Sequence, residues 1–298
     1  MINKQKLKET LQYEMLLLPA LAGFVIFFLY PSLQSIYYSL TNYSVNKLTY
    51  SFIGFTNYVE VFKDERILAS IRNTVYFAVF STLLQNALAI PLAIALNAKL
   101  KSKFLLRMVF FMPWCFSGLI IGFLWSFILS SSDDGLLNHV LHQLGIHFLP
   151  HNWLGDPGLA MKSVIFVAVW QTTGWAMIIY LANLQSIPAE LYESVKIDGA
   201  GKLQAFWHIT FKFLAPAMTI NVLLSTIGGF KVYDQILALT NGGPGYATES
   251  ITFSIMNYGF SENRYAYASA LSVVMLVIIL LISLVQLRFF SKREDNIA

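Results

Sequence analysis

Six long runs of mostly apolar residues dominate the hydrophobic pattern of the chain. They cover residues 15–40, 73–96, 104–129, 163–184, roughly 213–233, and 265–290. An α-helix needs about 20 such residues to cross a bilayer, and each run reaches that length. The pattern therefore predicts an all-α, polytopic membrane protein with six transmembrane helices.

Prolines and side-chain amides interrupt these runs without ending them. We expect Pro19 and Pro31 to kink or trim the first helix. Prolines inside the second and third helices are tolerated in lipid, because neighbouring helices satisfy the backbone groups that proline frees. Gln85 and Asn86 in the second helix are expected to form hydrogen bonds between helices.

The first run has an alternative interpretation, which is a cleaved signal peptide. Lys4, Lys6 and Lys8 precede it, as in the basic segment of a signal peptide. The run is long, however, carries Glu14 at its start and lacks a clear cleavage site. An uncleaved first transmembrane helix is therefore the preferred interpretation.

A polar stretch, ELYESVKIDGAGKLQAFWHIT, separates the fourth and fifth apolar runs. Its first half has the signals of a helix start, with Ser186 as the expected N-cap and Pro188 in the first turn. Glu190 and Glu193 follow in the early turns, where the positive end of a helix favours carboxylates. These signals predict a short helix that begins near residue 188.

Apolar and glycine positions complete this helix–glycine–helix pattern. Leu191 and Val195 are four residues apart and share one face of the first helix. The helix is expected to end at Asp198 and Gly199, since glycine commonly follows a helix end. A second amphipathic helix follows, with its apolar face at Leu203, Phe206, Trp207, Thr210, Phe211 and Leu214.

Two interpretations of this module compete. It could lie on lipid headgroups as an interfacial helix, which suits the aromatic face of the second half. The first half has two glutamates, an aspartate and only a narrow apolar stripe, which suit a groove on another protein better than an anionic membrane surface. We therefore expect a helix that docks on a partner.

Composition supports the membrane assignment. The 298 residues are 56% hydrophobic and only 12% charged, with a mean hydropathy of +0.60, whereas about a quarter of the residues of soluble domains are charged. The single Cys115 lies in an apolar run and allows no disulfide framework. The net charge of +4 is modest, and it reports topology and not nucleic-acid binding.

The distribution of Lys and Arg predicts the orientation. If both termini are inside, 13 of the 20 basic residues lie in inner segments, in agreement with the positive-inside rule. Both termini and the 185–212 loop are then cytoplasmic, and the outer loops cover about 41–72, 130–162 and 234–264. The remaining basic residues are Lys47, Lys63, Arg66, Arg72, Lys162, Lys231 and Arg264.

The module also carries a family signature. Glu193-Ser194-Val195, three residues, Gly199, nine residues and Ile209 resemble the Glu-Ala-Ala loop of permease subunits of binding-protein-dependent ABC importers. Ser194, Val195 and Lys212 depart from that pattern, but the flanks look like the sugar-permease version. The phrases FIGFTNYVEVF, NTVYFAV, FFMP, LTNGGPGYAT and YAYASALSVV extend the resemblance to the carbohydrate-uptake group, similar to maltose-type and glycerol-phosphate-type first permeases.

The resemblance implies a fold and partners. Residues 69–287 would form the transmembrane domain of a type I importer, with a coupling loop at 187–216. An N-terminal part at 1–68 would precede this domain, and a tail at 288–298 would follow it. A second permease would complete the pore, two ATPase subunits would bind ATP and Mg, and an extracytoplasmic solute-binding protein would deliver a sugar. The expected location is the plasma membrane of a bacterium. Residues expected to couple to the ATPase are Leu191, Glu193, Val195, Asp198, Gly199 and Ile209.

Polar and aromatic groups in the fourth and fifth helices are candidates for the substrate pathway. Sugars need hydrogen-bonding groups and flat apolar faces, and polar groups inside a helix bundle mark pathways. The candidates are Trp170, Gln171, Thr172, Trp175, Ser225, Gly229, Phe230 and Tyr233. By resemblance to maltose-type permeases, whose matching stretches line the sugar site, Thr172, Trp175, Ser225 and Gly229 are preferred. Structural roles remain open for them, because such residues also form aromatic belts and helix-packing contacts. Lys231 and Asp234 could pair, or Lys231 could extend to the membrane surface.

Other functions have weaker support. The chain has no G-x-x-x-x-G-K-[ST] phosphate loop, and NGGPG at 241–245 is expected to be a turn. A secondary sugar carrier is the main alternative, but it usually needs intramembrane carboxylates, and these helices hold essentially none. A membrane enzyme is also disfavoured, since metal or catalytic patterns are lacking. His139, His142, His147 and His151 are expected to be solvated loop residues and not metal ligands.

Overall fold

The computed structural model describes residues 15–46, 49–98, 100–131, 135–146 and 152–295, with side chains up to 290. Lys4, Lys6, Lys8, Glu14, Lys47, Lys99, His147 and His151 lie outside the described residues. The described chain is helical, apart from one isolated bridge between Thr41 and Phe52. It divides into two compact units, Met1–Lys63 with Ile255–Val274, and Asp64–Ser254 with Met275–Ala298.

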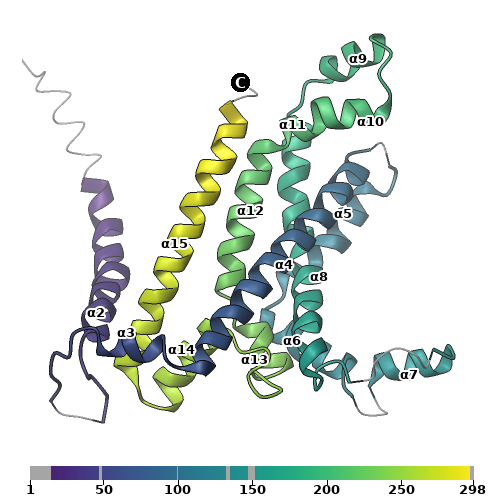
Figure 1. Ribbon diagram of the computed structural model, residues 1–298. Coiled ribbons are helices and arrows are strands. Elements are labelled where there is room, and N and C mark those ends of the chain that lie inside the picture. Colours follow the sequence, from purple (N-terminus) through teal and green to yellow (C-terminus); the bar gives the residue numbers. More distant parts are fainter. Residues whose placement is uncertain (1–14, 47–48, 99, 132–134, 147–151, 296–298) are drawn as a thin grey trace, which may run out of the picture. The chain divides into compact units, whose positions relative to one another are not determined.

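The structure confirms the six apolar runs as helical, but it divides them into two kinds. Four continuous helices are long and apolar enough to cross a membrane, at Met15–Ser39, Glu65–Asn97, Pro157–Gln185 and Tyr265–Phe290. Two further pairs of helices pass the same test but are bent, by 97° and by 63°. The described chain therefore has up to six spans, if each bent pair crosses once (Figure 1).

The larger unit is built around α4 (Glu65–Asn97) and α8 (Pro157–Gln185), which pack along much of their length. Aspartates begin both helices, because the carboxylates of Asp64 and Asp156 accept hydrogen bonds from the first backbone N–H groups. Pro157 occupies the first turn of α8, where its missing N–H has no consequence.

Polar residues inside spans also find partners, as predicted. Gln85 Nε2 donates to the Thr172 carbonyl at 3.2 Å, and Asn86 Oδ1 accepts from the hydroxyl of buried Tyr180.

The third predicted helix is not a straight span, which corrects the sequence prediction. It consists of α5 (Lys103–Phe111), the 3₁₀ turn η2 (Met112–Cys115) and α6 (Gly118–Ile128), with a bend of 97°. Pro113 interrupts the α-helical hydrogen bonds at the bend, and Ser117 begins α6 by accepting a hydrogen bond from Leu119 N. Hydropathy alone cannot detect this bend, because apolar residues continue through it.

Glycines allow the bent segment to approach its neighbours. A Cβ added at Gly174 of α8 would overlap the carbonyl oxygen of Phe110 in α5. A Cβ at Gly118 would lie 2.9 Å from the Cβ of Asp234 in α13 (Asp234–Leu239). Close backbone packing of this kind is common between membrane helices, where small residues replace large ones at the contact.

The polar stretch forms a short helix α9 (Ala189–Ile197), followed by α10 (Lys202–Ala205), the π-helical turn η3 (Phe206–Thr210) and α11 (Phe211–Phe213). A bend of 63° then leads into α12 (Ala215–Phe230). The predicted N-cap at Ser186 is wrong, because α8 runs to Gln185 and Ser186 ends that helix. Its hydroxyl donates to the Asn183 carbonyl at 2.8 Å, and Pro188 takes the N-cap position of α9 instead.

The smaller unit contains the first span and the polar segments that follow it. Its helix Met15–Ser39 includes a π-helical turn η1 (Val25–Leu29) just before Pro31 in α2 (Tyr30–Ser39). A short helix α3 (Thr56–Val61) is tied to the end of α2 by Asn57, whose amide donates to the carbonyls of Ser39 and Thr41. α14 (Ile251–Met256) and the turn η4 (Asn257–Ser261) lead into α15 (Tyr265–Asp295). An exposed ion pair joins Arg264 to Glu60.

Candidate functional site

A cavity of about 450 Å³ lies within the larger unit, between α4, η2, α8 and α12 and the residues that follow α12. Its wall combines aromatic rings with amide, hydroxyl and charged groups. It is lined by Phe77, Ser81, Gln85, Trp114, Ala168, Thr172, Trp175, Leu224, Ser225, Gly228, Gly229, Lys231, Val232, Tyr233, Asp234 and Gln235. A volume of this size and a mixed wall are typical of small-molecule sites.

Two tryptophans form an aromatic wall of the cavity. The indole rings of Trp114 and Trp175 are stacked, with centroids 5.3 Å apart and an angle of 28° between their planes. Trp114 lies in the 3₁₀ turn η2, so the bend after α5 is what brings this ring to α8. A flat ring of this kind offers an apolar contact surface together with a polar N–H group.

The hydroxyl of Ser225 is a free hydrogen-bonding group at the cavity wall. Its Oγ is buried and has no hydrogen-bond partner within the described chain. By contrast, the Thr172 hydroxyl already donates to the Ala168 carbonyl at 2.8 Å. Since a buried polar atom without a partner is unfavourable, Ser225 is poised to bind a polar group that enters the cavity.

Lys231 and Asp234 bring opposite charges to the same cavity. They form no ion pair with each other in the described part of the chain, so the pairing considered from their spacing is absent. Residues 231–233 stand between α12 and α13, and this break in the helix turns both side chains toward the cavity. Both charges are therefore available to a ligand.

The eight predicted pathway residues divide into two groups. Thr172, Trp175, Ser225, Gly229 and Tyr233 line the cavity. The other three do not. Trp170 faces outward with 41% exposure, and Phe230 is buried in the core with 2% exposure. Gln171 is also buried, where it donates to the Phe116 carbonyl at 3.1 Å and accepts from Gln235 at 3.0 Å.

Sequence reasoning missed the contribution of α4 and η2 to the cavity. Phe77, Ser81 and Gln85 lie at intervals of four residues, so they share one face of α4. The sequence did contain one sign of this contribution, because a serine and a glutamine lie four residues apart inside an otherwise apolar helix. Trp114 gave no such signal, because only the bend at η2 directs it to the cavity.

The second candidate site is the module at α9. The helix ends in a Schellman motif, in which Ala200 N donates to the Val195 carbonyl at 3.1 Å and Gly199 N donates to the Lys196 carbonyl at 3.2 Å. Gly199 has φ +76°, a left-handed conformation that favours glycine. No atom lies within 4 Å of a Cβ placed there, so backbone conformation, not crowding, explains the glycine.

The residues predicted to couple to an ATPase fall on two faces of this module. Leu191 and Val195 are half-buried and pack against a core that contains Ile209 and the ends of α4, α8 and α12. Tyr192 reinforces this contact through a hydrogen bond between its hydroxyl and Thr210. Glu193, Asp198 and Gly199 are exposed. The module thus has one face attached to the membrane helices and one free face.

Sequence reasoning also missed an apolar residue on the free face. Ile197 is 86% exposed, and Leu203 in the second helix is 71% exposed. Exposed apolar side chains of this size on a polar module are candidates for contact with a partner protein. α9 and α10 extend beyond the ends of α8 and α12, at the opposite end of this unit from α13 (Figure 1).

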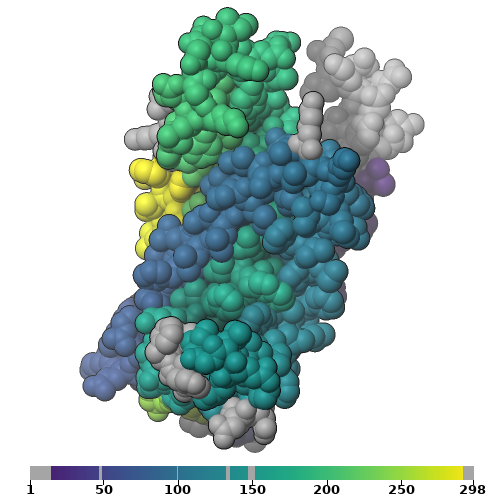
Figure 2. Space-filling model, turned by 90° about the vertical axis from the view of Figure 1, so that its right-hand side faces the viewer, coloured from purple at the N-terminus to yellow at the C-terminus, as the bar shows by residue number. Residues whose placement is uncertain are grey.

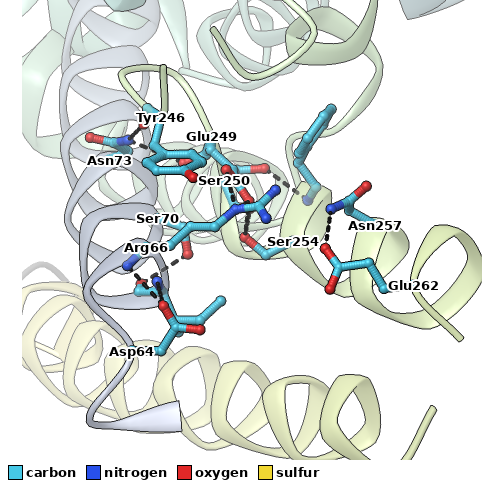
Figure 3. A network of polar contacts seen from close by, with 12 residues as sticks. Asp64, Arg66, Ser70, Asn73, Tyr246, Glu249, Ser250, Ser254, Asn257 and Glu262 are labelled. Carbon is cyan, nitrogen blue, oxygen red and sulfur yellow. Dashed lines mark hydrogen bonds and ion pairs between the residues drawn. The ribbon is translucent and has the colours of Figure 1, made fainter. Parts of the chain in front are cut away.

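A buried ion pair holds the segment after α13 against α4 (Figure 3). Arg66 Nε lies 3.0 and 2.9 Å from the two carboxylate oxygens of Glu249, whose side chain is only 2% exposed. Ser254 donates a further hydrogen bond to the same carboxylate at 2.8 Å. Asn73 completes the attachment by donating to the carbonyls of Tyr246 and Glu249. The expected NGGPG turn lies within this held segment, where Gly242 and Gly245 have positive φ.

The described residues contain no group of three or more His, Cys, Asp or Glu side chains that could hold a metal ion. His139 and His142 are exposed but lie on the helix α7 (Leu136–Gln143), which corrects the expectation of a loop at these two positions. His139 contacts the amide of Gln143, its neighbour one turn away.

Comparison with known proteins agrees with this geometry. Residues 85–294 match the family described as "Binding-protein-dependent transport system inner membrane component". The chain is 38% identical to the probable ABC transporter permease protein YurN of Bacillus subtilis, over 99% of this chain and 100% of the relative. It is 33% identical to the trehalose/maltose transport system permease protein MalF of Thermococcus litoralis, over 98% of each chain.

A solved structure shares the fold over nearly the whole chain. It is that of a bacterial alginate ABC transporter in complex with a pentasaccharide-bound periplasmic protein, with a TM-score of 0.84, 25% identity and coverage of 98% of this chain and 97% of that chain. The helical architecture, the family match and the long alignments agree. The chain belongs to the binding-protein-dependent transport system inner membrane components, which are the permease subunits of ABC importers.

Proposed function

We propose that this permease carries a sugar or oligosaccharide, and that the cavity at Trp175 and Ser225 is part of its pathway. The single observation that supports this most is the combination of a stacked tryptophan pair with a buried hydroxyl that has no partner in the described chain. Sugars present apolar C–H faces beside hydroxyl groups, and this wall matches both. Relatives named for trehalose, maltose and alginate transport agree with this substrate class.

Each lining residue has a defined role in this proposal. The Trp175 ring receives the C–H face of a sugar ring, and stacking on Trp114 keeps its plane in place. Ser225 forms a hydrogen bond with a sugar hydroxyl, and Lys231 and Asp234 offer a donor and an acceptor at the rim. Several weak contacts suit a pathway, since a carrier must release its cargo as well as bind it.

The free face of α9 is the proposed contact with an ATPase. Glu193 and Ile197 insert into the partner, while Leu191, Val195 and Ile209 connect α9 to the membrane helices. Gly199 forms the tight turn and Asp198 precedes it at the end of α9. Movement of the ATPases then reaches the cavity through the helix of residues 202–213 and α12, which carries Ser225 and Gly229.

The proposed assembly contains this chain, a second permease, two ATPase subunits and an extracytoplasmic solute-binding protein. ATP and Mg bind to the ATPases, and this chain binds no cofactor of its own. The excess of Lys and Arg at the α9 end and at both termini supports an orientation with both termini in the cytoplasm. The proposed location is the plasma membrane of a bacterium.

The test is uptake of labelled sugar by the complete complex in proteoliposomes, together with its ATPase rate. Trp175→Ala is expected to raise the KM for uptake about tenfold or more, because it removes a large buried contact surface. Trp170→Ala is the matched control, since Trp170 lies on the outer face of the same helix. Equal effects of the two substitutions would contradict the proposed pathway.

Coupling has its own test in the same system. Glu193→Ala with Ile197→Ser is expected to uncouple the complex, so that uptake falls while sugar binding remains. Ser194→Ala is the control at an exposed neighbouring position. Undiminished ATP-driven uptake by the double variant would refute the coupling role. Sugar movement by this chain without any ATPase would favour a secondary carrier instead.

A further inference from the structure

A second set of cavities lies on the side of the larger unit away from the sugar pathway, along the groove between α4 and α8. A polar cavity of about 550 Å³ stands at the outer end of both helices, and Arg72, Tyr76 and Lys162 line it. Both cations are exposed. Asn73 and the 244–247 turn close its far side. This cavity plays no part in the proposed transport mechanism.

The charge of this cavity is one-sided. The described residues that line it include one arginine and one lysine but no carboxylate. The nearest acidic group along α8 is Asp156, which does not line the cavity and whose Oδ1 accepts from the N–H groups of Gly158 and Leu159. Glu249 is likewise engaged by Arg66. Two cations in a pocket without a carboxylate favour an anion.

Two apolar grooves begin at this polar cavity. The first shares Tyr76 and Lys162 with it and continues along α4 over Phe80, Leu84 and Leu88. The second also contacts Lys162; it is lined by Trp125, Leu129 and Phe166 and extends past Lys162 to Leu159, Leu137 and Trp153. The volumes of the two grooves are about 320 and 370 Å³. Phe166 lines both and separates them.

The dimensions of the first groove match half of a bilayer. On α4 this groove runs from Tyr76 to Leu88, twelve residues apart, which corresponds to about 18 Å along the helix axis. The apolar core of one leaflet is about 15 Å thick. All four groove residues on α4, from Tyr76 to Leu88, are at least 37% exposed, so their outer faces are available to a ligand. In Figure 2 the surface of α8 is visible between α4 and the α5–α6 segment on this side of the unit.

We propose that this is a binding site for one anionic phospholipid. Arg72 and Lys162 bind the headgroup phosphate, and the two acyl chains occupy the grooves on either side of Phe166. A zwitterionic headgroup is disfavoured, because its ammonium group would meet two cations and no carboxylate among the described lining residues. A water-soluble phosphate would fill the polar cavity but leave both grooves empty.

The first experiment measures lipid retention by the complete transporter. The complex is purified from bilayers of equal parts phosphatidylglycerol and phosphatidylcholine, and bound lipids are counted by native mass spectrometry. Arg72→Gln with Lys162→Gln is expected to lower phosphatidylglycerol retention about tenfold or more, the effect of losing charge-assisted hydrogen bonds. Lys63→Gln with Arg288→Gln removes the same charge at exposed positions outside these cavities and is expected to change nothing. Equal loss in both double variants would overturn the proposal.

A second variant separates the lipid from other occupants. Leu84→Trp fills the first groove and leaves the two cations intact, so it is expected to reduce phosphatidylglycerol retention without folding defects. Added inorganic phosphate is expected not to displace the lipid. Displacement of the lipid by phosphate would show that the polar cavity binds a soluble anion alone, and full retention of lipid in the Leu84→Trp variant would show that no acyl chain occupies the first groove; either result would overturn the proposal. A cross-link from the groove to the second permease in place of lipid would also overturn the proposal.

Discussion

Replacing Arg66 by methionine tests whether its ion pair with buried Glu249 holds the segment after α13 against α4. The substitution keeps most of the apolar stem but removes the guanidinium group. The carboxylate of Glu249, with 2% exposure, would then keep only the hydrogen bond from Ser254 in place of a two-oxygen contact with Arg66. The loss of one partner of a buried pair typically costs about 3–5 kcal/mol, because the remaining charge is buried without compensation.

The strength of the ion pair gives an independent estimate of the expected loss of stability. Two charges 2.9 Å apart attract by about 6 kcal/mol at an effective dielectric constant of 20, and desolvation offsets part of that. We therefore expect a loss of about 3–5 kcal/mol.

The assay is reversible unfolding of the purified chain in detergent micelles at pH 7. The chain contains a matched control, because Arg264 and Glu60 form an ion pair whose side chains are 39% and 49% exposed. Arg264→Met also removes the contacts of the guanidinium group with the Tyr258 and Tyr267 rings, and it is expected to cost about 1–2 kcal/mol, less than Arg66→Met. The double variant Arg66→Met with Glu249→Met should lose less stability than the sum of the single variants. Equal losses for Arg66→Met and Arg264→Met, or strict additivity, would refute this reasoning.

Three further substitutions test other features. Gly199→Ala is expected to destabilise the turn after α9 by about 1–2 kcal/mol, because residue 199 has a left-handed backbone, and to lower ATP-driven uptake. Gly199→Asn should remain near wild type. Equal uptake by the two variants would contradict this prediction. Gly229→Ala places a Cβ 2.8 Å from the α4 backbone and should lower the thermal stability. At the neighbouring Gly228 a Cβ meets no atom, so Gly228→Ala should be neutral or stabilising. A lower stability of Gly228→Ala than of Gly229→Ala would be inconsistent with this packing. Tyr180→Phe leaves the side-chain oxygen of Asn86 without its hydroxyl donor and should lower the free energy of unfolding by about 1–3 kcal/mol in the same assay. An unchanged unfolding midpoint would mean that another donor replaces the Tyr180 hydroxyl.

Apolar length was sufficient to predict the spans, because the bilayer imposes it on any helix that crosses. The helix–glycine–helix module was equally predictable, since Gly199 and the flanking helical spacings are local signals. The 97° bend at Met112–Cys115 was not predictable, because Pro113 is compatible with either a kink or a break. The choice between a kink and a break depends on packing against Gly174, which is far away in the sequence.

The candidate cavity was predicted only in part for a related reason. A residue such as Ser225 or Trp175 can be identified as suitable for a sugar, but its direction depends on how α8 rotates against α4 and α12. Trp170 and Gln171 are adjacent to Thr172 in the sequence, yet the first faces outward and the second faces α13. On α9 the same ambiguity assigned Leu191 and Val195 to the partner-facing role, and left the exposed Ile197 unnoticed.

The pairing of Arg66 with Glu249 also has a consequence for how the chain is made. The two residues are 183 positions apart, and synthesis adds about 5–20 residues per second. Arg66 therefore emerges from the ribosome at least about 10 seconds, and up to about 40 seconds, before its carboxylate partner exists. During that interval the attachment of the 244–249 segment to α4 through Glu249 cannot form, so this part of the larger unit is completed only late in synthesis.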